Sequence, residues 1–221
     1  MSVIRPFNIK SWIEENRSLL KPPVGNKCVY TDTENFVVMV VGGPNARKDY
    51  HYNESEELFY QVEGNITVAI MEDGKPVDIE IKEGDVFLLP PKVPHSPRRP
   101  ANTIGIVIEK VRTDDDKDGL LWFCENCNEA LYKEYFHLDD IVEQFPPIME
   151  RFYSSEEYNI EIEEIVERTS MSYLDAMLYH ADENKLESET VAGLVNVKTK
   201  NKLREEAEIL HFMPKTSKLP I

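Results

Sequence analysis

Two segments decide the fold of this chain: residues 43–64 read GPNARKDYHYNESEELFYQVEG, and residues 84–99 read GDVFLLPPKVPHSPRR. The first places His51 and Glu57 six residues apart, and the second carries His95 after a proline-rich turn. Two imidazoles and one carboxylate suit a redox-active iron that keeps open positions for substrate and oxygen. The three side chains together therefore predict a metal site, although a single histidine on a strand is more often structural.

The composition places the chain among globular proteins. Its 221 residues are 41% apolar and 10% aromatic, enough for one good core and a small second unit. The formal net charge of −16 argues against direct binding of nucleic acid or of an anionic membrane. No apolar run approaches the length of a membrane span, and charged residues interrupt any signal-peptide core near the N-terminus. Three cysteines make no disulfide framework, so we expect a reducing cytoplasm.

Apolar alternation predicts a strand-rich region between residues 28 and 112, with turns and no helical pattern between the runs. The predicted strands cover residues 37–41, 58–62, 66–70, 77–81, 86–89 and 104–108. A short amphipathic helix with Asn8 as its N-cap is expected within residues 1–22. Short strands at this spacing favour a sandwich or a barrel, so the predicted fold class is mainly β.

The spacing of the two opening segments resembles the paired metal-binding motifs of a cupin barrel, a jelly-roll-like double-stranded β-helix. Asn53 stands where many cupins carry another histidine. More closely, residues 7–153 resemble the 3-hydroxyanthranilate 3,4-dioxygenase family. That resemblance is carried by GGPNARKDYH at 42–51, ELFYQ at 57–61, LLP at 88–90, VPHSP at 93–97 and NTIG at 102–105.

The family resemblance implies a nonhaem Fe(II) enzyme, usually a homodimer, that opens an aromatic ring with O2. Such enzymes convert 3-hydroxyanthranilate to 2-amino-3-carboxymuconate semialdehyde during NAD biosynthesis from tryptophan. By resemblance, Arg99 would bind the substrate carboxylate, and Arg47 would stabilise negative charge on the bound oxygen. Glu57 and Glu109 would also contact the substrate, Glu109 as a proton acceptor. Arg98 should face the opposite side of the extended chain and be structural.

These assignments have structural alternatives. Arg47 and Arg99 could be solvated surface residues, and Glu109 could simply pair with Lys110 or Arg112. The complete set favours an enzyme, because a barrel kept only for its shape has no need of all these side chains.

The cysteines do not complete the second iron site of many relatives, which takes two Cys-x-x-Cys pairs. This chain has one such pair, Cys124 and Cys127, and Cys28 lies far upstream. A site of four thiolates is therefore impossible within one chain, although His137 could supply a third ligand. We expect Cys124 and Cys127 to be a relic or a degenerate second metal site, and Cys28 to be a buried apolar residue.

The pattern changes from about residue 129, where strand signals fade and charged helical segments follow. Three helices are expected. The first covers residues 161–168, the second begins at a capping box formed by Ser172 and Asp175, and the third covers residues 202–210. We predict two domains, with a catalytic barrel at residues 1–157 and an α-helical extension at residues 158–221.

The extension resembles the late-transcription coactivator of tailed phages at residues 160–167, 171–176 and 212–221. That resemblance implies a contact with RNA polymerase and, through the extreme C-terminus, with a sliding clamp. An ordinary helical appendage is the structural alternative. The alternative function for the whole chain is a non-catalytic barrel whose tail recruits transcription machinery.

Overall fold

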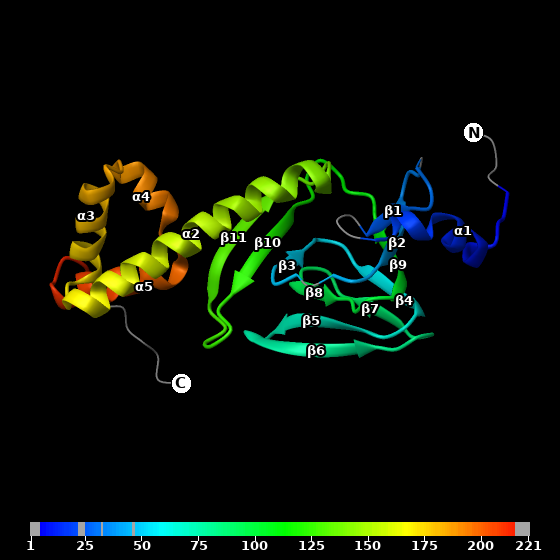
Figure 1. The fold of residues 1–221 in the computed structure, drawn as a ribbon, viewed down its shortest axis with the longest axis horizontal. Helices are drawn as coiled ribbons and strands as arrows, with labels where there is room; N and C mark the ends of the chain where they lie inside the picture. Colours follow the sequence, from blue (N-terminus) through cyan, green and yellow to red (C-terminus); the bar gives the residue numbers. More distant parts are fainter. Residues whose placement is uncertain (1–4, 22–24, 32, 46, 215–221) are drawn as a thin grey trace. The chain divides into compact units, whose positions relative to one another are not determined.

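The computed structural model describes the chain except residues 1–4, 22–24, 32, 46 and 215–221 (Figure 1). The chain divides into two compact units. The first comprises residues 1–121 and 135–138, and the second comprises residues 122–134 and 139–221. Within the described part of the chain, no helix combines the length and apolar character that crossing a membrane requires.

The described strands form two antiparallel sheets, as Figure 1 shows. The five-stranded sheet has the order β1 (Asn26–Cys28), β2 (Phe36–Gly42), β9 (Ile104–Lys110), β4 (Glu57–Glu63) and β7 (Val86–Leu89). The six-stranded sheet has the order β11 (Ala130–Phe136), β10 (Asp118–Phe123), β3 (Tyr50–Tyr52), β8 (His95–Arg98), β5 (Ile66–Glu72) and β6 (Lys75–Ile81). Between β6 and β9 the chain alternates from one sheet to the other, and the predicted mainly β barrel is confirmed.

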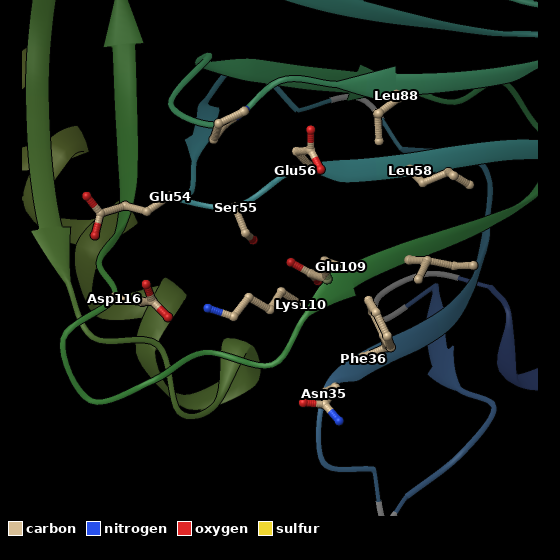
Figure 2. A pocket seen from close by; sticks show the side chains of 12 residues that line it. Asn35, Phe36, Glu54, Ser55, Glu56, Leu58, Leu88, Glu109, Lys110 and Asp116 are labelled. Carbon is tan, nitrogen blue, oxygen red and sulfur yellow. The ribbon is translucent and has the colours of Figure 1, made fainter.

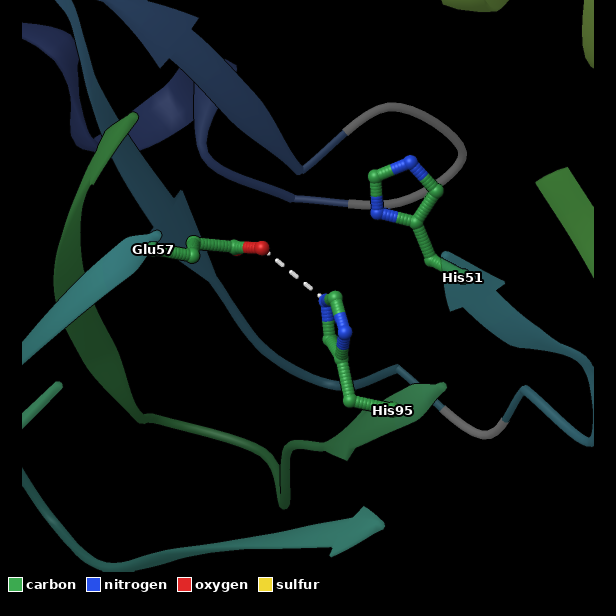
Figure 3. Close-up of side chains that lie close together, drawn as sticks. All are labelled: His51, Glu57 and His95. Carbon is green, nitrogen blue, oxygen red and sulfur yellow. Dashed lines mark ion pairs between the residues drawn. The ribbon is translucent and has the colours of Figure 1, made fainter. Parts of the chain in front are cut away.

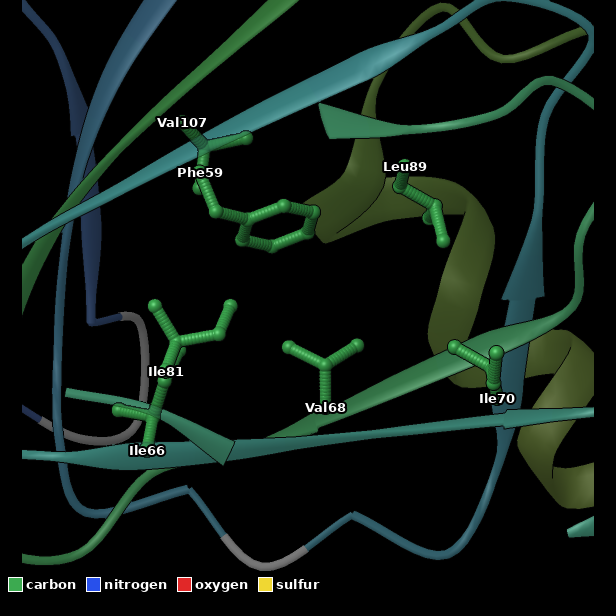
Figure 4. Packing of buried hydrophobic residues seen from close by; sticks show 7 residues of the cluster. All are labelled: Phe59, Ile66, Val68, Ile70, Ile81, Leu89 and Val107. Atoms are coloured by element: carbon green, nitrogen blue, oxygen red, sulfur yellow. The ribbon is translucent and has the colours of Figure 1, made fainter. Parts of the chain in front are cut away.

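The barrel core is built by alternate residues of both sheets, whose side chains point inward at every second position. Figure 4 shows the buried cluster of Phe59, Leu89 and Val107 from the five-stranded sheet with Ile66, Val68, Ile70 and Ile81 from the six-stranded sheet. Glu57 lies two residues before Phe59 and so shares its inward face, while His95 pairs across strands with Ile70. The predicted ligands therefore lie at one end of this apolar core.

The N-terminal helix α1 (Ile9–Asn16) is capped as predicted, since the Asn8 side chain accepts hydrogen bonds from two backbone N–H groups of the first turn. A 3₁₀ turn follows at Arg17–Leu19. Ile13 and Leu20 pack with Val40 and Ile104 to form a second buried cluster. At Gly42 a Cβ atom would lie only 2.1 Å from the Leu20 carbonyl oxygen, so this close approach requires glycine.

The second unit contains the helices α2 (Ile141–Thr169), α3 (Tyr173–Asn184), α4 (Ser188–Leu194) and α5 (Val197–Ile209). The predicted cap of α3 is confirmed, because the Ser172 side chain accepts from the Asp175 N–H. The helices predicted at residues 161–168 and 202–210 lie within α2 and α5, apart from Leu210. A buried cluster joins the helices: Tyr158, Ile162, Ile165, Ala176, Met177, Val191 and Val195.

Two predictions about local structure are wrong. Strands do not end before residue 129, because β11 follows it; Lys133 and Glu134 interrupt the apolar run that would have marked this strand. Cys28 is exposed rather than buried, since it ends the edge strand β1. The predicted domain boundary after residue 157 falls inside α2 and stays a prediction.

Candidate metal centre

Three strands bring the predicted metal ligands together. His51 is the central residue of β3, Glu57 opens β4, and His95 opens β8. His51 and His95 face each other across the β3–β8 pair, whereas Glu57 belongs to the other sheet. Their candidate ligand atoms all lie within 4.8 Å of one another, and no other such group of His, Cys, Asp or Glu occurs among the residues that the structure describes (Figure 3).

His95 and Glu57 form a buried pair, with His95 Nε2 2.9 Å from Glu57 Oε2. His95 Nδ1 lies 3.0 Å from the Val93 carbonyl oxygen, to which it can only donate, and this contact directs Nε2 toward Glu57. Burial opposes the charged form of both groups. The attraction between them outweighs burial, so the pKa of Glu57 is lowered and the pKa of His95 is raised. A divalent cation between them would replace the proton of His95.

His51 is held by a buried carboxylate that the motif analysis missed. Asp118 is 1% exposed, and its Oδ1 lies 2.7 Å from His51 Nε2. Arg112 secures the other side of this carboxylate, with Nε 2.6 Å from Asp118 Oδ2. Burial raises the pKa of Asp118, but the hydrogen bonds from His51 and Arg112 prevail and lower it. Asp118 opens the apolar strand β10, and a single acid at the start of such a strand was the available signal.

Glu109 lies directly opposite Glu57 across the β4–β9 pair. It is buried, and Arg112 Nη2 donates to its Oε2 at 2.9 Å. Burial raises the pKa of Glu109, and the negative charge of Glu57 raises it further. The pairing with Arg112 that was considered as the structural alternative is thus present, and it links Glu109 to the Asp118–His51 contact.

Arg99 is 3% exposed, which excludes the solvated alternative. Within the part of the chain that the structure describes, the Arg99 side chain donates one hydrogen bond, from Nη1 to Gln61 Oε1 at 3.4 Å. Burial lowers the pKa of Arg99 to about 10, although Glu57 opposes this shift. Gly105 makes the space, because a Cβ there would lie 2.8 Å from Arg99 Nη1. A buried guanidinium with so few partners is suited to an anionic ligand.

Arg98 differs from its neighbour as predicted. Its side chain is 48% exposed, and Nη1 lies 3.5 Å from Asp78 Oδ1 at the surface of the six-stranded sheet. Successive residues of an extended strand face opposite sides, which explains why one arginine enters the barrel and the next does not.

Arg47 is 30% exposed and forms an ion pair with the buried Asp49, with Nε 3.0 Å from Oδ1. Its role toward oxygen stays a prediction. Asn53 is buried beside the triad, and its Nδ2 lies 3.3 Å from Glu57 Oε2. The Asn53 Oδ1 atom has no hydrogen-bond partner among the described residues, which is rare for a buried polar atom and fits a site built to hold a further group.

A pocket of about 650 Å³ opens beside Glu109. Figure 2 shows the side chains that line it. Apolar side chains that line it, mostly on the five-stranded sheet, are Phe36, Leu58, Leu88, Pro91 and Ile108. The polar and charged side chains are Asn35, Glu54, Ser55, Glu56, Glu109, Lys110 and Asp116. His51, Glu57, His95 and Arg99 are absent from its lining. This pocket therefore reaches the predicted proton acceptor Glu109 but none of the predicted metal ligands.

The three remaining candidate ligands of the sequence analysis, Cys124, Cys127 and His137, do not join the triad. Cys124 and Cys127 lie in the loop between β10 and β11, in the second unit. His137 belongs to the first unit, where its Nδ1 lies 3.1 Å from the Asp116 carbonyl oxygen.

Comparison with known proteins gives two family matches. The model of the 3-hydroxyanthranilic acid dioxygenase family matches residues 1–153, and that of the phage late-transcription coactivator matches residues 151–220. A 3-hydroxyanthranilate 3,4-dioxygenase of Xanthomonas oryzae pv. oryzae is 54% identical over 153 residues, which are 69% of this chain and 86% of that relative. The enzyme of the same name from Xenopus tropicalis is 50% identical over 153 residues, 69% of this chain and 54% of that relative.

Solved structures are more distant. A protein of Neisseria meningitidis has a TM-score of 0.38 and 19% identity, covering 49% of this chain and 100% of its own. A cupin-superfamily protein of Desulfitobacterium hafniense has a TM-score of 0.38 and 13% identity, covering 51% of this chain and 95% of its own.

Proposed function

Because this chain belongs to the 3-hydroxyanthranilic acid dioxygenase family, we propose that it is a 3-hydroxyanthranilate 3,4-dioxygenase. It would convert 3-hydroxyanthranilate and O2 to 2-amino-3-carboxymuconate semialdehyde on the route from tryptophan to NAD. The observation that carries this proposal is the combination of a His–Glu–His triad, with Glu57 and His95 buried and His51 half-buried, with a buried arginine and a second buried glutamate inside one barrel.

The cofactor that we propose is one Fe(II) held by His51, Glu57 and His95. A mixed set of two imidazoles and one carboxylate suits nonhaem iron, whereas structural zinc prefers four ligands that include thiolates. When bound, Fe(II) would supply a meeting point for the substrate's hydroxyl and amine and for O2. His95→Ala should abolish stoichiometric iron binding, and undiminished iron content in that variant would refute the ligand set.

The substrate would be oriented by Arg99. Its guanidinium is buried, and pairing with the substrate carboxylate would supply the hydrogen bonds that the protein itself provides only sparingly. The barrel interior excludes water around this pair, which strengthens the attraction.

Proton transfer would fall to Glu109. Its raised pKa suits a carboxylate that accepts a proton from the substrate hydroxyl, and Arg112 fixes the position of its Oε2 atom. Arg47 would balance negative charge that develops on oxygen during the reaction, and Asp49 would hold its guanidinium in place.

The decisive assay is oxygen consumption by anaerobically iron-loaded protein with 3-hydroxyanthranilate. Arg99→Ala should weaken substrate binding by on the order of 2–5 kcal/mol, the cost of removing one partner of a desolvated charge pair. Arg98→Ala is the matched control, because it removes an exposed arginine at the adjacent position. An analogue without the carboxylate, 2-aminophenol, should bind poorly to wild type and lose little more in Arg99→Ala. Equal losses for both ligands would show that Arg99 supports the fold instead.

A homodimer and a cytoplasmic location remain predictions of the sequence. Exposed apolar side chains on the five-stranded sheet support a dimer interface on that sheet: Phe36, Tyr60, Val86 and Leu88. Val86→Lys should then shift the molecular mass measured by light scattering toward the monomer. An unchanged dimer in that variant would place the interface elsewhere.

The helical tail has a second candidate role. The match of residues 151–220 to the phage late-transcription coactivator supports a contact with RNA polymerase and a sliding clamp. Co-purification of the full chain with phage-host RNA polymerase tests this contact. The non-catalytic barrel considered as the alternative is not favoured, because the relatives of the barrel are named as enzymes.

A further inference from the structure

The loop between β10 and β11 contains both cysteines in a defined turn. The Cys124 N–H donates to the Glu129 carbonyl oxygen at 2.8 Å, and the Asn128 N–H donates to the Cys124 carbonyl oxygen at 2.9 Å. Asn128 has a φ of 62°, a left-handed conformation that asparagine tolerates better than most residues. These contacts fold residues 124–128 back on themselves, so that the Cys127 side chain lies within hydrogen-bonding reach of the Cys124 sulfur.

The two sulfur atoms have different surroundings. The Cys124 sulfur accepts hydrogen bonds from the backbone N–H groups of Cys127 and Asn126, and these lower its pKa. The Cys127 thiol also donates to it, and the Lys198 ammonium adds a favourable charge. Cys124 is half-buried and Cys127 is exposed. The loop therefore holds one sulfur whose pKa is lowered beside a second, solvent-accessible thiol.

A metal does not account for this arrangement. Tetrahedral zinc and iron sites need four ligands, and the described residues gather no His, Cys, Asp or Glu group around the two cysteines. The donors that do converge on Cys124 are N–H, S–H and ammonium groups, which stabilise a thiolate without any metal ion.

We propose that Cys124 and Cys127 form a redox-active dithiol that closes to an intramolecular disulfide by exchange with a low-molecular-weight disulfide. The Cys124 thiolate attacks one sulfur of that oxidant, breaking its S–S bond and releasing one thiolate. Cys127 then loses its proton and attacks the Cys124 sulfur of the mixed disulfide, which releases the second thiol. The protein gives up two electrons and two protons, and the oxidant is reduced to two thiols. Nothing in this reaction depends on the function proposed for the barrel.

The test uses the full chain, reduced and then equilibrated anaerobically with mixtures of reduced and oxidised glutathione. Thiols are trapped with a maleimide and counted by mass spectrometry of the intact chain and of the peptide that contains residues 124–127. Two thiols should disappear together as the mixture becomes more oxidising, and that peptide should lose two hydrogen masses. Cys28→Ser should behave identically, since Cys28 lies on a different strand.

Single variants separate the two roles. Cys127→Ser should trap one glutathione on Cys124, because no resolving thiol remains, and Cys124→Ser should react with glutathione disulfide much more slowly. Both cysteines lie in a loop, and circular dichroism verifies that the variants are folded.

Three results would overturn the proposal. One is independent modification of all three thiols in the wild-type chain. Another is a Cys124 in Cys127→Ser that reacts no faster than Cys28. The third is protection of both thiols by Zn(II) alone at one ion per chain or per pair of chains, which would assign the loop to a metal.

Discussion

The buried carboxylate of Asp118 orients His51. Asp118→Asn keeps the shape of the side chain but removes the charge that faces His51 Nε2, so metal affinity should fall by about 10- to 100-fold. Anaerobic competition titration with Fe(II) or Co(II) measures this loss. Asp115→Asn is the matched control, because Asp115 is an exposed acid of the preceding loop. Wild-type affinity in Asp118→Asn would mean that the strands alone hold His51.

Glu109 should determine the acidic limb of the activity profile. A proton acceptor must begin deprotonated. Because the pKa of Glu109 is raised above its ordinary value of 4.5, falling pH already protonates this carboxylate before the pH reaches 4.5. The ratio kcat/KM should therefore fall as the pH drops through a pKa above 4.5 and should recover as the pH rises. Glu109→Gln should abolish the limb and lower kcat by about 10²- to 10⁴-fold. Glu80→Gln, on the exposed side of β6, should change neither, and an unaltered limb in Glu109→Gln would belong to another group.

At the scale of elements, the start of α3 is stabilised from two directions. Ser172 caps the Asp175 N–H, and the Glu206 carboxylate of α5 accepts from the N–H groups of Tyr173 and Leu174. Ser172→Ala should lower the free energy of unfolding of the helical unit by about 1 kcal/mol, as for other lost N-caps. Urea unfolding followed by circular dichroism at helical wavelengths measures the change. Ser154→Ala, at an exposed position inside α2, should be neutral or slightly stabilising, and an equal loss there would point to a general effect.

Strands with strong apolar alternation were predictable, and the strands that carry the histidines were not. Residues 66–70 and 77–81 alternate cleanly and became β5 and β6. The strands β3 and β8 are short and polar, and β8 includes Pro97, so hydrophobic periodicity gave no signal for either. Their histidines were found from their residue type, their spacing and the family resemblance, none of which depends on local strand propensity.

The supporting network around the ligands could not be predicted in the same way. Asp118 lies 67 residues from His51, and the hydrogen bond between them depends on how β10 pairs with β3. Gly105 likewise appears as an ordinary strand residue until Arg99 is seen to occupy the space above it. Spacing within a motif finds the candidate ligands, but the residues that would orient them come from strand register, which one sequence does not reveal.

At the scale of the whole molecule, the barrel should function without most of its helical tail. Residues 1–157 retain the triad and also Phe152, which stacks on Trp122 with ring centroids 4.4 Å apart. A chain ending at residue 157 should therefore stay folded, bind one iron and keep ring-opening activity. Iron analysis and oxygen consumption, each compared with the full chain, measure this. Loss of iron on truncation would show that the tail belongs to the fold of the enzyme and that the boundary is wrong.

The placement of the triad has a consequence for the supply of the protein in a cell. Two of the proposed ligands come from the six-stranded sheet and one from the five-stranded sheet, so a bound ion would cross-link the two layers. Free metal at about 100 times its Kd would add about 2.7 kcal/mol to the stability of the folded state. Chain without the ion would open and be cut by proteases more often. Cells starved of the metal should consequently hold less of this protein, an adjustment of abundance to nutrition that requires no sensor and no change in transcription.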